Sequence, residues 1–222
     1  MHYPLTSALD DYDAVIVANG DYPTHPIPLG AIDRAHFICC CDNAARTLCD
    51  HGRRPDAVVG DGDSLPRTYK QKLEGVWHHV AEQDDNDQTK ATRFCVSRGF
   101  KRIAYVGCTG KREDHALGNI SLIVNYMQHF NIQPVMLTNY GSFLPVMGDN
   151  TIGTFPGQQV SVFDFGCTKL ITEGLKWPTT HFEEWWQGTL NEATGNAMHI
   201  TTNGPCLIYR TYEGKDVEAC KE

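Results

Sequence analysis

The chain carries little positive charge for its size. Its 222 residues include 19 lysines and arginines against 27 aspartates and glutamates, a formal net charge of −8. A protein that binds a nucleic-acid backbone needs a basic face, so this balance argues against a nucleic-acid partner. One nucleotide is still compatible with it, because a few local cations and a metal ion can offset its phosphates.

Long apolar runs are also missing. No segment approaches the roughly 20 residues that cross a bilayer, and no basic stretch followed by an apolar one marks a secretion signal near Met1. We therefore expect no membrane partner and a cytoplasmic location. The hydrophobic share of 41% and the charged share of 21% are typical of a globular chain with a sizeable core.

The nine cysteines lack the paired C-x-x-C spacing of zinc and redox motifs. Three of them are consecutive, at 39–41, inside an apolar run where they act as small buried side chains. A disulfide framework is not expected at this length, so we predict reduced, structural thiols. His78 and His79 are adjacent in a predicted strand and point to opposite faces, which argues against joint chelation of zinc.

Three common catalytic and nucleotide-binding patterns are absent. No Ser or Thr follows Gly110-Lys111, so this pair is not part of a P-loop, and there is no G-x-G-x-x-G dinucleotide pattern. The serines and cysteines show no nucleophile elbow, which leaves covalent catalysis without support.

What the first part of the chain does contain is an alternation of short apolar runs and helical patterns. The runs predict strands, and the stretches with helical spacing predict helices at 43–51, at 86–98 and from 114. This alternation is typical of a Rossmann-like α/β/α domain, in which helices cover both faces of a parallel sheet. The predicted strands are 13–19, 36–41, 57–60, 78–81, 102–106 and 134–138.

The pattern changes near residue 141. From there, short β-rich runs at 159–165, 197–202 and 206–212 are separated by Gly, Pro and Asn, as in an antiparallel β-sandwich. The stretch from Asn139 to Ser142 supplies turn residues at the boundary. We therefore predict an α/β domain over 1–141 and a β-sandwich domain over 142–222.

Acidic side chains cluster after three of the predicted strands. Because the carboxyl ends of parallel strands meet at one edge of a sheet, where ligands bind, we expect these clusters to converge. Carboxylates gathered at one place repel unless a cation joins them, and hard oxygen ligands suit Mg²⁺. The residues are Asp61, Asp63, Asp84, Asp87 and Asp114.

The loop from Gly107 to Arg112 is rich in small residues and ends in two cations. It joins a predicted strand to a predicted helix. Backbone N–H groups, the helix dipole and the side chains of Lys111 and Arg112 together predict a polyphosphate site.

Tryptophans are concentrated in the second part of the chain. Spacing favours a core or interface role for Trp177, Trp185 and Trp186. A cationic heteroaromatic ligand could equally stack on one of them.

In this order, the motifs resemble those of the thiamine pyrophosphokinase family. Three positions depart from the family pattern: Asn86 replaces a Thr, Lys111 a Gly and Leu190 a Ser. The segments that carry the resemblance are 41–45, 55–64, 83–91, 110–115 and 117–120 in the first part, and 174–177 and 189–192 in the second.

The resemblance implies transfer of pyrophosphate from ATP to the hydroxyl of thiamine, which yields thiamine diphosphate and AMP. It implies an ATP- and Mg²⁺-binding first domain, a thiamine-binding second domain and a homodimer. Catalytic roles fall on Asp61, Asp63, Asp84, Asp87, Arg112 and Asp114, of which Asp61, Asp63 and Asp87 would hold Mg²⁺. ATP contacts fall on Asp42, Asn43, Gln83, Lys90, Thr109, Lys111 and His115, and thiamine contacts on Gln83, Asp114, Trp177 and Asn191.

Two other functions are compatible with the same residues. One is a Mg²⁺-dependent phosphohydrolase that acts on a nucleotide or a thiamine phosphate with water as acceptor. The other is a non-catalytic sensor of a nucleotide or of thiamine, which would bind its ligand and release no AMP.

Overall fold

A computed structural model describes residues 1–62, 66–82 and 84–215 of the chain. The backbone divides into two compact units. One runs from Ala8 to Asn139, and the other combines Met1–Ser7 with the chain from Tyr140 onward. The sequence pattern did not predict that the first residues fold with the later part of the chain.

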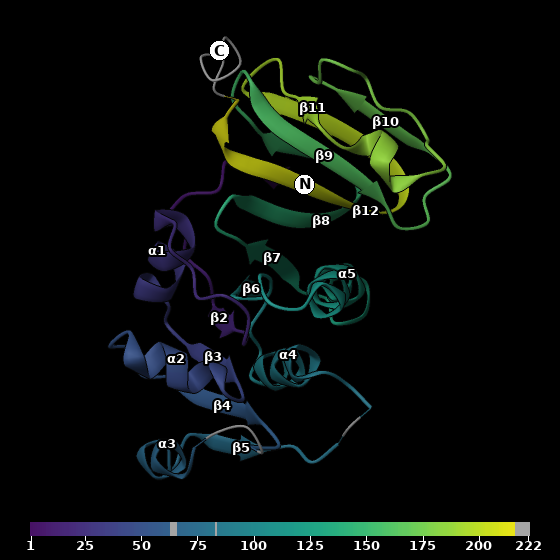
Figure 1. The fold of residues 1–222 in the computed structure, drawn as a ribbon. Helices are drawn as coiled ribbons and strands as arrows, with labels where there is room; N and C mark the ends of the chain where they lie inside the picture. Colours follow the sequence, from purple (N-terminus) through teal and green to yellow (C-terminus); the bar gives the residue numbers. More distant parts are fainter. Residues whose placement is uncertain (63–65, 83, 216–222) are drawn as a thin grey trace. The chain divides into compact units, whose positions relative to one another are not determined.

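The unit formed by residues 8–139 is built on a parallel sheet (Figure 1). Its strands lie in the order β7-β6-β2-β3-β4-β5, and all their pairings are parallel. The three strands β2, β3 and β4 are buried along their whole length, as strands covered on both faces should be. The bounds are β2 Ala14–Val17, β3 Ile38–Cys41, β4 Ala57–Gly60, β5 Trp77–His79, β6 Arg102–Val106 and β7 Gln133–Leu137.

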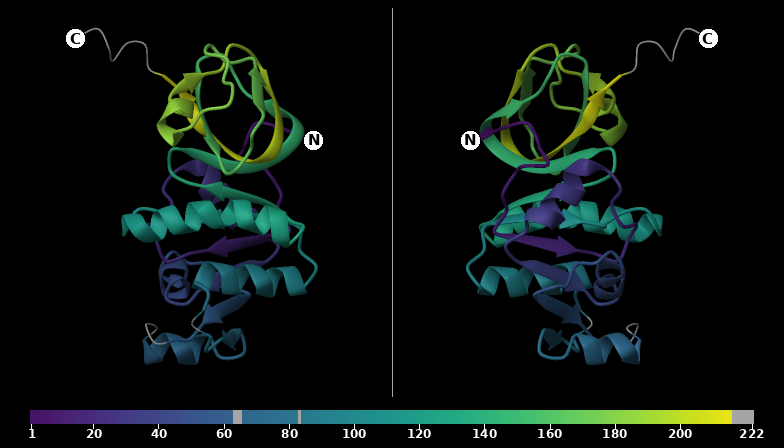
Figure 2. Two further views of the ribbon diagram at one scale, coloured as in Figure 1. Left: turned by 90° about the vertical axis from the view of Figure 1, so that its right-hand side faces the viewer. Right: turned by 90° about the vertical axis from the view of Figure 1, so that its left-hand side faces the viewer.

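Helices cover both faces of this sheet. The left view of Figure 2 has α4 and α5 in front, and the right view has α1 and α2 in front. The sequence predicted α2, α4 and α5 but missed α1 and α3. Pro26 and Pro28 made the α1 segment resemble a loop in the sequence, although proline fits the first turn of a helix. Helix α3 buries no side chain, so its sequence shows no periodic apolar face. The bounds are α1 Pro26–Arg34, α2 Ala44–Asp50, α3 Arg67–Lys72, α4 Asp87–Ser97 and α5 Glu113–His129.

The second unit consists of β-strands around one apolar core. Its pairings are antiparallel, except that β1 runs parallel to β8. The bounds are β1 His2–Tyr3, β8 Gly141–Gly153, β9 Gln158–Asp164, β10 Leu170–Glu173, β11 Asn191–Glu192 and β12 Ala197–Gly214, with the 3-10 helix η1 at Trp185–Gly188.

Strand β12 organises this second unit. It pairs with β8 on one side, and on the other with β10 at 199–202 and then with β9 from Cys206. The register of the β12–β8 ladder shifts between Thr202 and Cys206, where Asn203, Gly204 and Pro205 led the sequence analysis to predict two separate runs. Gly141 and Ser142, predicted as turn residues, instead begin β8.

The predicted fold class is confirmed. A parallel α/β unit is followed in the chain by antiparallel strands. None of the helices that the structure describes is long and apolar enough to cross a membrane.

Candidate active site

A cleft of about 530 Å³ opens at the carboxyl edge of the parallel sheet. This volume lies within the usual range for small-ligand sites. The loops that follow β2, β3, β4 and β6 contribute to its wall, together with the first turns of α4 and α5. Of the residues predicted for the site, Asp42, Asp61, Asp87, Lys90, Thr109, Lys111, Arg112 and His115 line it.

The cleft lies where the strand order reverses. Strands β2 and β6 are neighbours, but the chain leads from β2 to β3 on one side and from β6 to β7 on the other. Crossovers on either side of such a point leave a crevice outside the strand ends, and ligands bind there in open α/β sheets. The sheet topology therefore positions the cleft.

The loop after β2 forms one wall that the sequence analysis did not assign to the site. The backbone N–H of Gly20 donates to the Gly107 carbonyl at 2.6 Å, and that of Asp21 donates to the Thr109 carbonyl at 2.8 Å. Lys111 Nζ donates to the Asn19 carbonyl at 2.8 Å. The turn residues at the end of the first buried strand were the available signal, and only the strand order shows their significance.

Gly110 is required where these two loops meet. Its φ is +105°, and a Cβ placed on it would lie 2.2 Å from Asp21 Oδ2. Any side chain at this position would strain the backbone and displace the neighbouring loop. The glycine therefore sets the path of the chain just before Lys111 and Arg112.

Asp42 enters the cleft through an unusual backbone conformation. Its φ is +41°, in the left-handed region, and its side chain follows directly after β3. A Cβ on Gly60, at the end of β4, would lie 2.9 Å from the Asp42 Cβ. The glycine thus allows the ends of two neighbouring strands to bring Asp42 and Asp61 to the same cleft.

The electrostatics of the cleft centre on Asp87, the first residue of α4. Burial raises the pKa of its carboxyl, and the nearby charges of Asp42 and Asp61 raise it further. Lys90 opposes this increase in the pKa, because its buried Nζ lies 3.5 Å from Asp87 Oδ1. The three carboxylates therefore repel one another in a partly desolvated place.

This donor set fits a hard divalent cation. Carboxylate oxygens are the ligands that Mg²⁺ prefers, and a cation would remove the repulsion that acts on Asp87. In the part of the chain that the structure describes, carboxylate oxygens of Asp42, Asp61 and Asp87 do not all lie within 4.8 Å of one another. Asp63, the other predicted Mg²⁺ ligand, and Gln83 lie outside the described residues.

A hydrogen-bond network joins the two helix starts to the loop after β6. Asn86 caps α4 by accepting from the Thr89 N–H at 2.9 Å. Its amide donates to Asn119 Oδ1 at 3.0 Å, and the Asn119 amide donates to the Cys108 carbonyl at 2.9 Å. Asn119, on α5, therefore holds the first turn of α4 against the predicted phosphate loop.

Arg112 and Asp114 form a two-point ion pair at the start of α5. The guanidinium donates to Asp114 Oδ1 at 3.1 Å and to Oδ2 at 2.5 Å. This pairing, helped by the His115 backbone N–H, lowers the pKa of Asp114 to about 2. A carboxyl with so low a pKa accepts a proton poorly.

Not every predicted residue lines the cleft. Asn43 lies at the start of α2, while Asp84 and Asp114 are exposed and do not contribute to the wall. The predicted thiamine residues Trp177 and Asn191 instead line a hollow of about 370 Å³ in the second unit. Asn191 Oδ1 accepts a hydrogen bond there from the backbone N–H of Trp177 at 3.2 Å. The asparagine therefore positions the backbone that carries the indole side chain.

Two family models match consecutive parts of the chain. Residues 30–136 match the thiamin pyrophosphokinase catalytic domain, and residues 141–209 match the thiamin pyrophosphokinase substrate-binding domain. The chain belongs to the thiamin pyrophosphokinase family. The family resemblance predicted from the ordered motifs is thereby confirmed.

Curated relatives share the family name. The thiamine pyrophosphokinase of Bacillus subtilis is 31% identical over 112 residues, which is 49% of this chain and 52% of that protein. Thiamine pyrophosphokinase 1 of Oryza sativa is 24% identical over 196 residues, 74% of this chain and 72% of the relative. The sequence match thus spans only about half the length of the bacterial relative.

Solved structures of family members share the fold. The Bacillus subtilis thiamine pyrophosphokinase matches with a TM-score of 0.77 at 23% identity, covering 91% of this chain and 99% of that one. The Candida albicans thiamin pyrophosphokinase matches with a TM-score of 0.76 at 13% identity, covering 96% and 92%. At these identities the structural match establishes the common fold.

Proposed function

We propose that this chain transfers pyrophosphate from ATP to the hydroxyl of thiamine, giving thiamine diphosphate and AMP. The observation that carries the proposal is the cleft at the carboxyl edge of the sheet. There the carboxylates of Asp42, Asp61 and Asp87 share a wall with the cations of Lys111 and Arg112, in a chain of the thiamin pyrophosphokinase family. Opposite charges arranged in this way suit a polyphosphate bound together with a metal ion.

Asp61, Asp63 and Asp87 would hold Mg²⁺. Asp63 stands two positions after Asp61 in the sequence, and Asp42 lines the same cleft. When bound, the cation would offset negative charge on the phosphate oxygens and assist their displacement. Lys90, only 4% exposed, would keep Asp87 ionised and correctly oriented.

The basic loop would bind the phosphates that are transferred. Arg112 is the N-cap of α5 and Lys111 precedes it, so both lie at the helix N-terminus, where backbone N–H groups and the helix dipole also favour an anion. His115 and Thr109 line the same wall. In pyrophosphate transfer most of the rate comes from positioning and charge stabilisation, which this wall supplies.

In the transfer step the hydroxyl oxygen of thiamine bonds to the β-phosphorus of ATP. The bond from that phosphorus to the oxygen bridging the α-phosphate breaks, and AMP leaves with the electron pair. The hydroxyl proton passes to a carboxylate or to water. Because the ion pair with Arg112 lowers the pKa of Asp114 to about 2, we assign Asp114 to orienting Arg112 or the hydroxyl. Asp84 is the other candidate acceptor from the sequence, but its exposed side chain does not line the cleft.

The hollow in the second unit would receive thiamine. Trp177, 55% exposed, offers an aromatic face, and a cationic heteroaromatic ring stacks favourably on indole. Lys176 Nζ already lies 5.0 Å from that ring centre, so a ligand cation would replace it. A homodimer and a cytoplasmic location, predicted from the sequence, remain predictions.

The decisive experiment measures AMP release from ATP and Mg²⁺ with and without thiamine, and identifies the thiamine product by mass. We expect AMP and thiamine diphosphate in equal amounts, both dependent on thiamine. Inorganic phosphate or pyrophosphate without a pyrophosphorylated acceptor would instead establish a phosphohydrolase. Ligand binding without AMP release would establish a sensor.

A further inference from the structure

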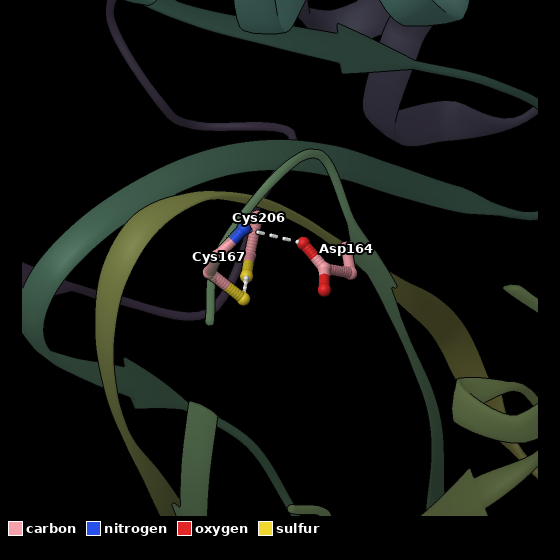
Figure 3. A group of neighbouring side chains, drawn as sticks. All are labelled: Asp164, Cys167 and Cys206. Carbon is pink, nitrogen blue, oxygen red and sulfur yellow. Dashed lines mark hydrogen bonds between the residues drawn. The ribbon is translucent and has the colours of Figure 1, made fainter. Parts of the chain in front are cut away.

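A cluster of side chains of the types that can ligate a metal ion lies in the antiparallel unit, apart from the carboxylates of the cleft. Ligand atoms of Asp164, Cys167 and Cys206 all lie within 4.8 Å of one another (Figure 3). The two Sγ atoms are 3.4 Å apart. Both cysteines are buried, with 2% and 0% of their surface exposed.

The backbone brings these residues together for local reasons. Asp164 ends β9, and Cys206 stands directly opposite it on β12. The Asp164 Oδ1 atom accepts the backbone N–H groups of Gly166 and Cys167, each at 2.7 Å, which turns the chain back toward β12. The Oδ1 atom therefore stabilises the turn, and the Oδ2 atom takes no part in these two hydrogen bonds.

That second oxygen, Oδ2, faces a histidine. His181 Nδ1 lies 3.6 Å from it, and His181 belongs to the segment between β10 and η1. Asp164, Cys167 and His181 line one hollow of about 460 Å³. A cation could therefore enter from this hollow. His181 is not among the residues whose ligand atoms all lie within 4.8 Å of one another, so its ring would have to shift toward the sulfurs to complete a set of four donors.

We propose that Asp164, Cys167, His181 and Cys206 form a binding site for a thiophilic divalent cation of the Zn²⁺ class. Two thiolates, an imidazole and a carboxylate are the donors that Zn²⁺ takes in a closed tetrahedral site. Such donors disfavour Mg²⁺, so this site would not compete for the metal of the cleft.

The sulfur separation excludes a formed disulfide and is compatible with two thiols in contact or with two thiolates that share a metal. Two thiolates on one tetrahedral Zn²⁺, each about 2.3 Å from the metal, lie about 3.8 Å apart. A disulfide requires about 2.0 Å. The observed 3.4 Å is much closer to the metal-bound spacing, and only small outward shifts of the sulfurs are needed. Binding would release the two thiol protons to water.

The position of His181 gives the site a consequence for the second hollow. His181 lines that hollow as well, together with Trp177 and Asn191. A bound cation would tie the segment that carries His181 to β9 and β12. The wall that carries Trp177 would then be held by a metal bond in addition to its hydrogen bonds.

The test uses the full chain, kept reduced, stripped of metal with a chelator and titrated with Co²⁺ alone. We expect thiolate-to-cobalt charge-transfer absorption that saturates at one Co²⁺ per chain and disappears when Zn²⁺ is added. Co²⁺ bound by the carboxylates of the cleft gives no such band, so the result does not depend on the proposed transferase activity. Cys167→Ser removes one of the two thiolates and should reduce the band by about half or more. His181→Ala should weaken Co²⁺ binding roughly tenfold or more.

Matched variants keep this test decisive. Cys49→Ser removes a half-buried thiol of the other unit and should leave the band unchanged. Asp164→Asn keeps an oxygen for the turn but removes the charge, so the fold should persist while Co²⁺ binding weakens. The proposal is overturned if no thiolate band forms, if the band keeps its full intensity in Cys167→Ser, or if mass analysis finds the two cysteines joined with the loss of two hydrogens.

Discussion

At the residue scale, individual charged side chains in the cleft differ in their effect on the stability of the folded state. Asp87 is a partly buried carboxylate whose pKa is raised by burial and by its acidic neighbours, so its charge opposes folding and serves binding. Lys90 partly offsets that charge from a position that is almost fully buried. Such arrangements are typical of functional sites, where stability is given up for chemistry.

Removal of one carboxylate should separate activity from stability. In Asp61→Asn we expect turnover to fall by roughly two to three orders of magnitude, since one charge-stabilising group is lost. The free energy of unfolding should change by no more than about 0.5 kcal/mol, because Asp61 is not fully buried. Steady-state kinetics and urea unfolding measure the two effects. Asp33→Asn, at an exposed position of α1, is the control for charge loss. An unfolded or fully active Asp61→Asn variant would contradict the assignment.

The Arg112–Asp114 pair predicts a specific pH dependence. Because its pKa is lowered in the folded protein, from 3.8 to about 2, the Asp114 carboxyl favours the folded state above pH 3.8. That contribution is lost as the pH falls through about 2. An NMR titration of the Asp114 carboxyl should show a midpoint at about 2, moving upward in Arg112→Gln and staying unchanged in Arg54→Gln. A midpoint near 3.8 in the unsubstituted chain would show that the pair does not form in solution.

At the element scale, the site depends on how helix starts and loops are joined. The loops after β2 and β6 hydrogen-bond to each other, and α4 and α5 are joined through the Asn86 and Asn119 amides. Each element contributes only one or two functional side chains. Their relative positions therefore depend on these links between elements.

Asn119→Ala tests this dependence. The substitution leaves the part-buried Cys108 carbonyl without its partner, while water can replace the partner of the exposed Asn86 amide, so the cost should be about 1 kcal/mol of unfolding free energy. The α4 start and the phosphate loop would also lose their common support, so KM for ATP should rise more than kcat falls. Asn125→Ala, at an exposed position of the same helix, should change neither quantity. An unchanged KM for ATP would show that the phosphate loop is held by its other contacts.

At the scale of the whole molecule, each of the two units has its own core and its own hollow. Residues 1–7 join the second unit through the parallel pairing of β1 with β8 and through Arg210. This side chain is 3% exposed and donates to the Pro4 carbonyl at 3.2 Å, to Thr6 Oγ1 at 3.2 Å and to the Gly153 carbonyl. It is thus a buried polar connection between the first and last strands of the chain.

Arg210→Met should therefore destabilise one unit selectively. We expect a loss of about 2 kcal/mol, since buried carbonyls lose their donor. Hydrogen exchange should accelerate in β1, β8 and β12 and stay slow in β2, β3 and β4. Arg46→Met, at a half-exposed position of α2, serves as the control. Equal acceleration in both units would show that they unfold together.

The sequence by itself determined much of the architecture and the candidate chemistry. The buried runs that became β2, β3, β4 and β6, and the helical spacing of α4 and α5, follow from short-range periodicity. Asp61, Asp87 and the Lys111-Arg112 pair could be placed in one site because parallel strands share a carboxyl edge. Asp84 and Asp114, placed there by the same argument, do not line the cleft. The two missed helices were missed for different reasons: Pro26 and Pro28 mask the start of α1, whose Pro28, Ala31 and Ile32 are buried, and α3 buries no side chain that would give a periodic apolar face.

Only the tertiary structure decided what depends on strand order and register. The adjacency of β2 and β6 brought Asn19 and Gly20 into the cleft, and the left-handed backbone of Asp42 turned its carboxylate toward Asp61 and Asp87. The pairing of β9 with β12 joined Cys167 and Cys206 across 39 residues. These contacts link residues that are distant in the chain, and the local spacing of residues does not predict which distant strands will pair.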